Sequence, residues 1–481
     1  MKVYFRYITV FLMFGFLTGC MVGPDYKRPE VDLPLKWRVD TNNDVETVNT
    51  TWWEQFNDAT LNELIQIALR ENKELRIAAL RVEEFNARLQ IVESALFPQL
   101  GIGSSLTGNK LSENRQFAPP HDRASLRETY EFGAVVNWEL DLWGRIRRSR
   151  EAATAEVLSD KENYQAVMLK LVADVASAYM QLLSLDRDLE ITKELLKNRE
   201  KIVQLNELKF SNGAISKYEL DQIYLIYEKA KSNIPIKERQ IAHLENALSV
   251  LLGQNPGPIS RRNTLETLTI PAVPQGIPSE ILARRPDVRQ AEQDLIAANA
   301  RIGVAKAQYF PTISLTNLFG YASTELSTLL LHKSNYYTFG ATTLFPIFTA
   351  GRIAGQVRQN EAVQQQTLSK YLRTIQTVFQ EVEDALISNQ KLKEQFDIQA
   401  RQLEILQGIH HLELRRFDGG YSSYIDVLNT EQNLYNAEIT QVQNRRDICV
   451  ALIQVYKTMG GGWLISEDEK VNTDISLREK L

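Results

Sequence analysis

The chain has 481 residues, 44% of them hydrophobic, and a formal net charge of −5, so it is long enough to bury a large core. Its mild charge and lack of a long basic block argue against nucleic acid as a partner. No catalytic cluster, phosphate-binding glycine loop or nucleophile elbow is visible, so neither enzymatic activity nor a metal or cofactor is expected. The adjacent His410 and His411 are expected to be surface residues rather than metal ligands.

Residues 1–19 have the pattern of a signal peptide. Lys2 and Arg6 precede an apolar run that is too short to span a membrane as a helix. The run ends in Leu17-Thr18-Gly19-Cys20, which resembles a bacterial lipobox and implies cleavage before Cys20 and acylation of this cysteine. Met21 at the second mature position then implies export to the outer membrane. The alternative is an ordinary signal peptide next to an incidental cysteine.

Residues 20–58 are predicted to form a lipidated, proline-rich tether that lies on the rest of the protein. Trp52 and Trp53 are expected to anchor it as buried core residues. A helical pattern follows from Ala59 to about Ala95.

Two strands are predicted next, at 99–107 and 129–142, joined by a polar loop. The second strand alternates, and its apolar face carries Phe132, Ala134, Val136, Trp138, Leu140 and Leu142. A later segment repeats this face with Phe339, Ala341, Thr343, Phe345 and Ile347. Two hairpins could form a small sheet on a soluble core, but such strands also suit a transmembrane barrel. Four strands cannot close a barrel, whereas three chains would supply twelve.

Residues 144–210 contain no proline and would extend for about 100 Å as one continuous helix. The apolar residues Leu171, Val175, Ala178, Leu182, Leu185 and Leu189 alternate in spacings of four and three, which predicts a coiled-coil seam. Val378, Val382, Ala385, Asn389, Leu392 and Phe396 form the corresponding seam later in the chain.

Each long helix is predicted to end in a tight turn and to be followed by a returning helix. Lys209 and Arg416 place a cation in the last helical turn, and Gly213 and Gly420 can adopt the left-handed cap. The returning helices begin with the capping boxes Ser216 with Glu219 and Ser423 with Asp426.

These patterns occur twice, which indicates an internal duplication. The first structural repeat is placed at 59–253 and the second at 286–460, and each consists of a helix, a β-hairpin and a long helix pair. A proline-rich equatorial linker at 254–285 joins them, and residues 461–481 form an equatorial tail. The predicted fold class is mainly α with a small β part: a long α-helical coiled-coil barrel plus four transmembrane β-strands per chain, closed as a trimeric 12-stranded β-barrel.

Several stretches resemble the TolC family of outer-membrane efflux factors, in particular its lipoprotein branch, which includes OprM and CusC. The matching segments are Val22 to Pro29, Trp52-Trp53, Trp138 to Arg145, Arg284 to Asp287, Tyr309 to Pro311, Tyr424 to Leu428 and Gly460 to Trp463. The resemblance implies a homotrimer in the outer membrane of a Gram-negative bacterium, with a tunnel projecting into the periplasm. Its partners would be a periplasmic adaptor and an inner-membrane pump of the resistance-nodulation-division type. The tips would dock the adaptor through Lys209, Gly213, Ser216, Arg416, Gly420 and Ser423.

A periplasmic gate is expected near the second tip. Family members often have Asp at the position of Asn429, whereas the acidic residue of this turn is Asp426. Asp426 is therefore the first candidate, with Arg415, Arg416 and Tyr421 as possible partners and Asn429 as the second candidate. The alternative is that Asp426 only completes the capping box.

The sequence thus predicts an outer-membrane channel of a tripartite efflux system, passively conducting small toxic compounds or antibiotics. The alternatives are an outer-membrane duct for protein secretion and a non-channel coiled-coil lipoprotein that spaces the envelope.

Overall fold

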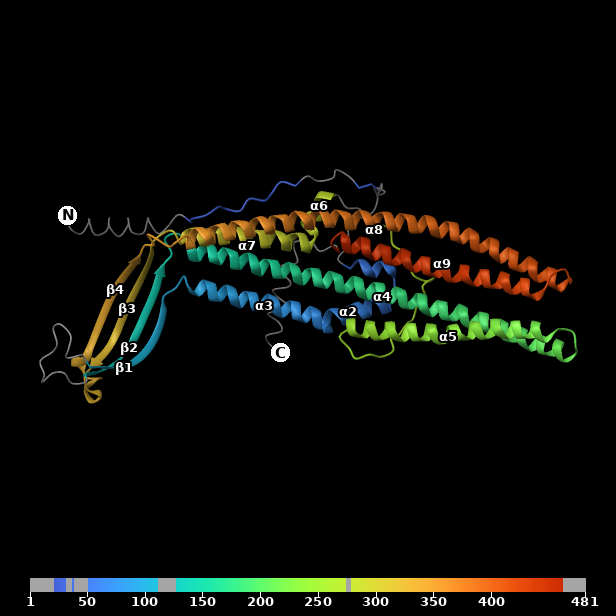
Figure 1. Cartoon of the computed structure of the whole chain (residues 1–481), viewed down its shortest axis with the longest axis horizontal. Helices are drawn as coiled ribbons and strands as arrows, with labels where there is room; N and C mark the ends of the chain where they lie inside the picture. Colours follow the sequence, from blue (N-terminus) through green and yellow to red (C-terminus); the bar gives the residue numbers. More distant parts are fainter. Residues whose placement is uncertain (1–20, 32–36, 39–50, 111–126, 274–277, 462–481) are drawn as a thin grey trace. The chain divides into compact units, whose positions relative to one another are not determined.

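The computed structural model describes residues 21–31, 37–38, 51–110, 127–273 and 278–461. The signal peptide, Cys20, most of the tether beyond Val31 and almost all of the 461–481 tail lie outside the described residues. Within them the chain is predominantly helical and carries one small sheet (Figure 1).

The first repeat begins with a short 3-10 helix, η1 (Trp52–Phe56), followed by α2 (Ala59–Glu71) and α3 (Lys73–Ser94). It continues with β1 (Gln99–Asn109), β2 (Arg127–Leu140), α4 (Arg145–Ser211) and α5 (Lys217–Leu251). The linker ends in α6 (Pro278–Arg284). The second repeat contains α7 (Pro286–Ala307), β3 (Thr312–Ser323), the 3-10 turns η3 (Leu326–Thr328) and η4 (His332–Ser334), β4 (Asn335–Leu344), α8 (Arg352–Asp418) and α9 (Tyr424–Thr458).

The predicted duplication is visible in the lengths of the helices. The long helices α4 and α8 have 67 residues each, and the returning helices α5 and α9 have 35 each. The helices α3 and α7, which precede the sheet strands, have 22 residues each. The helices α3, α4 and α5 of the first repeat therefore have partners of equal length in the second, whereas α2, with 13 residues, has none there.

The helix predicted from Ala59 to about Ala95 is instead two helices, because the chain is extended at Asn72. The Asn72 side chain donates to the carbonyl of Leu251 at 2.8 Å and accepts from the amide of Leu75 at 2.9 Å. It thus ends α2 and caps α3 at the same position. This contact with the end of α5 is remote in sequence, so the local pattern did not reveal the break.

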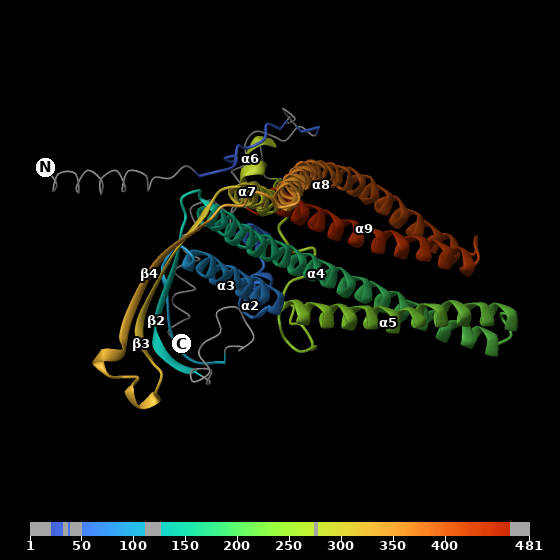
Figure 2. The same cartoon turned by 60° about the vertical axis from the view of Figure 1, so that its left-hand side comes forward.

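The two predicted hairpins form one antiparallel sheet with the strand order β1-β2-β3-β4 (Figure 1). The central pair β2–β3 joins the two halves of the duplication, with Phe132 opposite Tyr321 and Trp138 opposite Leu315. Figure 2 shows that β2, β3 and β4 curve together.

Several strand ends differ from the prediction. β1 extends to Asn109 and β2 begins at Arg127, each beyond the predicted bounds. β2 ends at Leu140 because Asp141 accepts hydrogen bonds from the amides of Ile146 and Arg147 and so starts α4. β4 ends at Leu344, so the expected face residues Phe345 and Ile347 lie beyond the strand, on either side of Pro346.

Contacts divide the chain into two compact units, and each unit takes segments from both repeats. The first unit comprises the segment up to Glu30, Arg81–Asp160 and Gln290–Tyr371, and it contains the whole sheet. Its helical part is held by an alanine-rich contact between α4 and α7, made by Ala152, Ala155, Ala297 and Ala300. Small side chains allow two helix backbones to approach each other closely.

The second unit comprises Val31–Leu80, Lys161–Arg289 and the chain from Leu372 onward. Its core surrounds the middle of α4, where the predicted seam residues Leu171, Val175 and Leu182 are buried. Residues off the seam, such as Tyr179 and Met180, are fully buried as well, so α4 packs on several faces here rather than on one stripe. An 18-residue window of α4 is apolar enough to span a membrane, but 56% of it is buried, as expected for a core helix.

The tryptophans of the tether lie in this core, as predicted. Trp52 and Trp53 are 1% and 3% exposed, and the Trp52 ring stacks on Tyr456 of α9 at 5.1 Å between centroids. The linker packs on the same unit. Its Arg261 donates two hydrogen bonds to Asp186 of α4, and its Leu265 is fully buried.

Candidate functional site

The sheet has two chemically different faces. Strand pairing places one set of apolar side chains on a single face: Leu100, Ile102, Leu106, Phe132, Val136, Trp138, Leu315, Phe319, Tyr337 and Phe339. The opposite face is mainly polar or small and carries Ser105, Glu131, Asn137, Glu139, Ser314, Thr316, Thr338 and Thr342. The alternation predicted for the second strand is therefore confirmed and extends across all four strands.

The apolar face is open to its surroundings in the single chain. Ile102, Tyr337 and Phe339 are 75%, 79% and 71% exposed. Soluble monomers rarely expose a contiguous apolar area of this kind, whereas strands with one apolar and one polar face are typical of barrels in membranes.

Two glycines bring the central strands together on the polar face. Gly133 of β2 lies directly opposite Gly320 of β3. A Cβ atom on Gly320 would lie 2.3 Å from the carbonyl oxygen of Phe132, closer than real side chains approach. Glycine at both positions is therefore required for this strand geometry.

The first tip, between α4 and α5, has the predicted construction. Gly213 has φ +73°, and the amide of Ala214 donates to the carbonyl of Lys209 at 2.8 Å. Ser216 and Glu219 form a complete capping box at the start of α5. These bonds satisfy backbone groups that a helix end leaves without partners.

The second tip, between α8 and α9, repeats this construction. Gly420 has φ +76°, and the amide of Tyr421 donates to the carbonyl of Arg416 at 2.8 Å. Ser423 and Asp426 form the capping box of α9.

The two tips lie next to each other. The Lys209 ammonium of the first tip lies 5.4 Å from the ring centroid of Phe417 in α8, within range of a cation–π interaction. Phe417 also packs edge-on against Tyr424 of α9 at 5.1 Å between centroids. Tyr421 is 81% exposed, so the second tip presents an aromatic side chain to solvent.

The gate candidate Asp426 is engaged in the cap. Its Oδ2 atom accepts from the Ser423 amide at 3.1 Å and from the Ser423 hydroxyl at 2.9 Å. In the described part of the chain Arg416 pairs with Glu413 at 3.3 Å rather than with Asp426. Asp426 and Asn429 are both exposed on the first turns of α9, so both remain available to a neighbouring chain.

The helices that carry the tips also hold an ion-pair cluster that the sequence did not predict. Arg199 of α4 has a side chain only 4% exposed, and its guanidinium lies 3.4 Å from the Glu431 carboxylate of α9. It also donates to Gln432 Oε1 at 2.9 Å and to the carbonyl of Ile226 in α5 at 3.1 Å. One side chain thus connects three helices.

Burial raises the pKa of the Glu431 carboxyl, and the positive charge of Arg199 offsets only part of this rise. A small apolar cluster of Val203, Ile223 and Leu428 lies nearby and packs the same three helices together. An arginine in a long polar helix is indistinguishable from a solvated residue by sequence pattern alone, so Arg199 gave no signal.

The expectation for His410 was inaccurate. This residue is half-buried, and its Nδ1 atom lies 3.0 Å from the hydroxyl of Thr430 in α9. Burial and the neighbouring His411 lower the pKa of His410.

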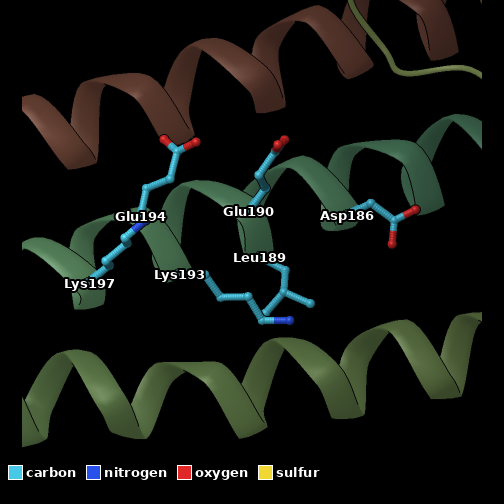
Figure 3. Close-up of a pocket in the computed structure, with 6 residues that line it drawn as sticks. All are labelled: Asp186, Leu189, Glu190, Lys193, Glu194 and Lys197. Carbon is cyan, nitrogen blue, oxygen red and sulfur yellow. The ribbon is translucent and has the colours of Figure 1, made fainter.

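A shallow depression of about 380 Å³ lies along α4 and is lined by Asp186, Leu189, Glu190, Lys193, Glu194 and Lys197. Figure 3 shows Glu190 and Glu194 directed to one side of α4 and Leu189 and Lys193 to the other. Lys193 approaches Glu238 of α5 at 3.9 Å. This mixture of exposed charges from one helix is typical of a solvated surface.

The chain matches the family model for outer membrane efflux proteins over residues 64–254 and 277–461. It is 34% identical over 454 residues to the cation efflux system protein CusC of Escherichia coli, covering 93% of this chain and 96% of that protein. It is 32% identical over 459 residues to the toluene efflux pump outer membrane protein TtgF of Pseudomonas putida, covering 93% and 95%.

Solved structures agree with these sequence matches. The CmeC outer membrane channel of Campylobacter jejuni aligns with a TM-score of 0.87 and 26% identity, over 95% of this chain and 98% of that one. The open state of the MtrE outer membrane channel of Neisseria gonorrhoeae aligns with a TM-score of 0.83 and 28% identity, over 92% and 98%. These proteins are outer membrane channels rather than enzymes, and the resemblance found in the sequence is confirmed. The chain therefore belongs to the outer membrane efflux protein family and is an efflux channel of the outer membrane.

Proposed function

We propose that three copies of the chain close their sheets into one twelve-stranded barrel and form a passive duct. The observation that carries this proposal is the sheet, with its exposed apolar face and with β1 and β4 as edge strands among the described residues. Unpaired strand edges are not tolerated in lipid, and four strands cannot close on themselves. Twelve strands are even in number and wider than the eight whose interior side chains fill.

A pair of variants tests this arrangement. Phe339 and Thr338 are adjacent in β4 but lie on opposite faces of the sheet. If residue 339 faces lipid, Phe339→Arg should lower the free energy of unfolding by about 2–4 kcal/mol. If residue 338 faces a water-filled lumen, Thr338→Arg should leave it nearly unchanged. Mass measurement in detergent should give three chains per particle for the wild type and Thr338→Arg only. A monomer that still conducts ions would contradict the proposal.

We further propose that Cys20 carries a covalent lipid. The support is the Leu17–Cys20 motif, which lies outside the described residues. Wild-type protein should incorporate a radiolabelled fatty acid, and Cys20→Ser should not. Lack of label in the wild type would contradict this part of the proposal.

The tips are proposed to dock a periplasmic adaptor that connects the channel to an inner-membrane pump. The support is their exposure and their ordered turns around Gly213 and Gly420. Cysteines introduced at Ala214 and Tyr421 should crosslink to the adaptor, whereas a control cysteine at Leu326, next to the sheet, should not. Crosslinking from Leu326 alone would refute the assignment.

The gate is proposed to involve Asp426 and Asn429, with Arg416 and Tyr421 nearby. The support is that both candidate side chains are exposed on one side of the first turns of α9. Three-fold symmetry would bring three copies of each residue around one axis, where a ring of carboxylates attracts cations.

The cargo is proposed to be small toxic compounds or antibiotics, selected by the pump rather than by the duct. One relative is named for toluene efflux and another for cation efflux, and both are nearly equally similar to this chain. The sequence identity of the channel therefore does not indicate which compound is exported. The duct itself is expected to catalyse no reaction. A susceptibility panel on a deletion strain, with co-purification of the adaptor, would identify the exported compounds and the partner.

A further inference from the structure

The segment Met21–Arg28, which we call the strap, is held on the surface of α4 and α7 within the first unit. The amide of Val22 donates to the carbonyl of Trp143 at 3.1 Å. Gly23 has φ +107° and lies against Gly303 of α7, so closely that a Cβ on Gly23 would be 2.4 Å from the Gly303 Cα. The strap therefore touches the helix backbone itself.

Gly303 is needed for this contact rather than for the helix. A Cβ atom at this position would lie 2.8 Å from the carbonyl oxygen of Val22 and 2.9 Å from Cγ of Arg148. Glycine in a helix interior disfavours the helix relative to alanine. Its presence here is explained by the strap that lies across it.

Arg148 of α4 depends on the strap for most of its hydrogen bonds. Its side chain is 3% exposed and donates to Asp25 Oδ1 at 2.6 Å and to the carbonyls of Val22 and Gly23 at 3.3 and 3.4 Å. Its remaining partner is Glu151 of the same helix, at 2.8 Å. A buried guanidinium without hydrogen-bond partners is strongly unfavourable, so the strap and Arg148 stabilise each other.

A second set of contacts holds the strap on α7. Glu292, which is 8% exposed, accepts from the Tyr26 hydroxyl at 3.0 Å and from Arg28 Nε at 2.6 Å, with Arg28 also bonded through its Nη2. Asn299 donates to the carbonyl of Pro24 at 2.9 Å. These helix side chains are largely covered and aimed at the strap, as in a peptide-binding groove.

We propose that this surface of α4 and α7 is a docking groove whose occupant is the chain's own strap, and that docking fixes the N-terminus at the junction between β2 and α4. The groove consists of Arg148, Glu292, Asn299 and Gly303. Met21 lies against Gly144 of that junction, where a Cβ would be 2.9 Å from Met21 Cγ. Cys20 precedes Met21 directly, so a lipid on Cys20 starts one residue from the junction. This last step rests on the proposed lipid anchor.

Docking has a further consequence for the anchor. A protease needs an extended, accessible segment, and cleavage after Lys27 would separate Cys20 from the body of the protein. The groove holds both neighbours of Lys27, namely Tyr26 and Arg28, on Glu292. The docked strap thereby protects the connection between the proposed lipid and the channel.

The test compares two alanine substitutions in helices of the same unit. Gly303→Ala places a methyl group against the strap, whereas a Cβ on Gly355 of α8 meets no atom within 4 Å. Detergent-purified full-length protein is treated with a lysine-specific endoprotease, and cleavage after Lys27 is followed by mass spectrometry. Gly303→Ala should raise the cleavage rate about 5- to 30-fold, and Gly355→Ala should leave it unchanged. Equal rates in the wild type and Gly303→Ala would overturn the proposal.

A variant on the strap itself covers the case in which Gly303→Ala disturbs the fold. Arg28→Gln removes the ion pair with Glu292 without altering a helix and leaves the Tyr26 bond to Glu292 in place. It keeps the cleavage site after Lys27, and the cleavage rate, taken relative to that of the same bond in the denatured variant, should also rise. If it does not, the groove assignment is wrong. Fatty-acid labelling of each variant is measured in parallel. Loss of label in the wild type would refute the lipid anchor alone, whereas resistance of Gly303→Ala and Arg28→Gln would refute strap docking alone.

Discussion

The hairpin of α4 and α5 and the hairpin of α8 and α9 have the same backbone construction. Their helices have equal lengths, their turns contain a glycine with φ +73° or +76°, and their returning helices begin with complete capping boxes. These features satisfy requirements of the backbone: a left-handed turn residue and partners for free amides. Duplication has kept them in both copies.

The residues that connect the hairpins to each other differ between the copies. Arg199 of α4 corresponds to Leu406 of α8, 207 residues later, so the buried guanidinium has no counterpart. Val203 and Ile223, which pack as apolar residues, correspond to His410 and Thr430, which form a hydrogen bond of 3.0 Å. The local structure of the hairpins thus repeats, whereas the residues that connect one hairpin to the other are specific to each copy.

Loss of the Arg199 cluster should be the most damaging change. Arg199→Met leaves the largely covered Glu431 carboxylate without its partner, which should lower the free energy of unfolding by up to about 3–5 kcal/mol. The matched control Leu406→Met, at the corresponding position of the other copy, should cost less than about 1.5 kcal/mol. Denaturant unfolding followed by circular dichroism measures both values. Similar small effects would show that the two positions are equivalent after all.

The turn glycines should behave alike in the two copies. Gly213→Ala and Gly420→Ala each force a side chain into the left-handed region, which should cost about 1–2 kcal/mol. Gly408→Ala, in the interior of α8 where a Cβ meets nothing, should instead stabilise by about 1 kcal/mol. A clear difference between Gly213→Ala and Gly420→Ala in thermal unfolding would break the equivalence of the tips.

Substitution of the acidic capping residues Glu219 and Asp426 can distinguish a structural role from a gating role. Glu219→Ala and Asp426→Ala each remove a capping-box partner and should lower stability by about 1 kcal/mol. If Asp426 also closes the channel, only Asp426→Ala should raise single-channel conductance and admit large antibiotics. Unchanged conductance in Asp426→Ala would exclude it as the gate, and Asn429 would then be tested in the same way.

The smallest expected effect concerns pH. The pKa of His410 is lowered in the folded state, so the unfolded state binds more protons below the ordinary value of 6.5. The contribution of His410 to the free energy of unfolding is therefore complete above pH 6.5. It declines as the pH falls through the pKa that His410 has in the folded state. Converting the pair to its first-copy equivalent, His410→Val with Thr430→Ile, should remove this decline. Identical pH profiles of stability for the wild type and the double variant would contradict the assignment.

Much of the architecture follows from local sequence signals. Unbroken helical patterns predicted the long helices, Gly213 and Gly420 marked the turns, and the capping boxes located the starts of α5 and α9. Period-two alternation predicted the strands and their faces. Each of these signals depends on residues close together in the chain.

Features that depend on distant partners were not predicted. The break at Asn72 rests on a bond to Leu251, and the burial of Arg199 rests on Glu431, more than 200 residues away. The role of Gly303 depends on a strap much earlier in the chain, because a Cβ atom on Gly303 would lie 2.8 Å from the carbonyl oxygen of Val22. In each case the side chain has an ordinary local interpretation, and only the fold supplies the partner that changes it.

The open sheet has a consequence for how the protein is made. A chain bound for the outer membrane crosses a watery compartment while carrying strands whose apolar residues, such as Ile102 and Phe339, have nothing to cover them. Edge strands of this type are templates for uncontrolled pairing between chains. Formation of the sheet and oligomerisation of the chains must therefore be coupled during biogenesis. Variants that delay oligomerisation should be lost to aggregation and degradation rather than accumulate as stable single chains.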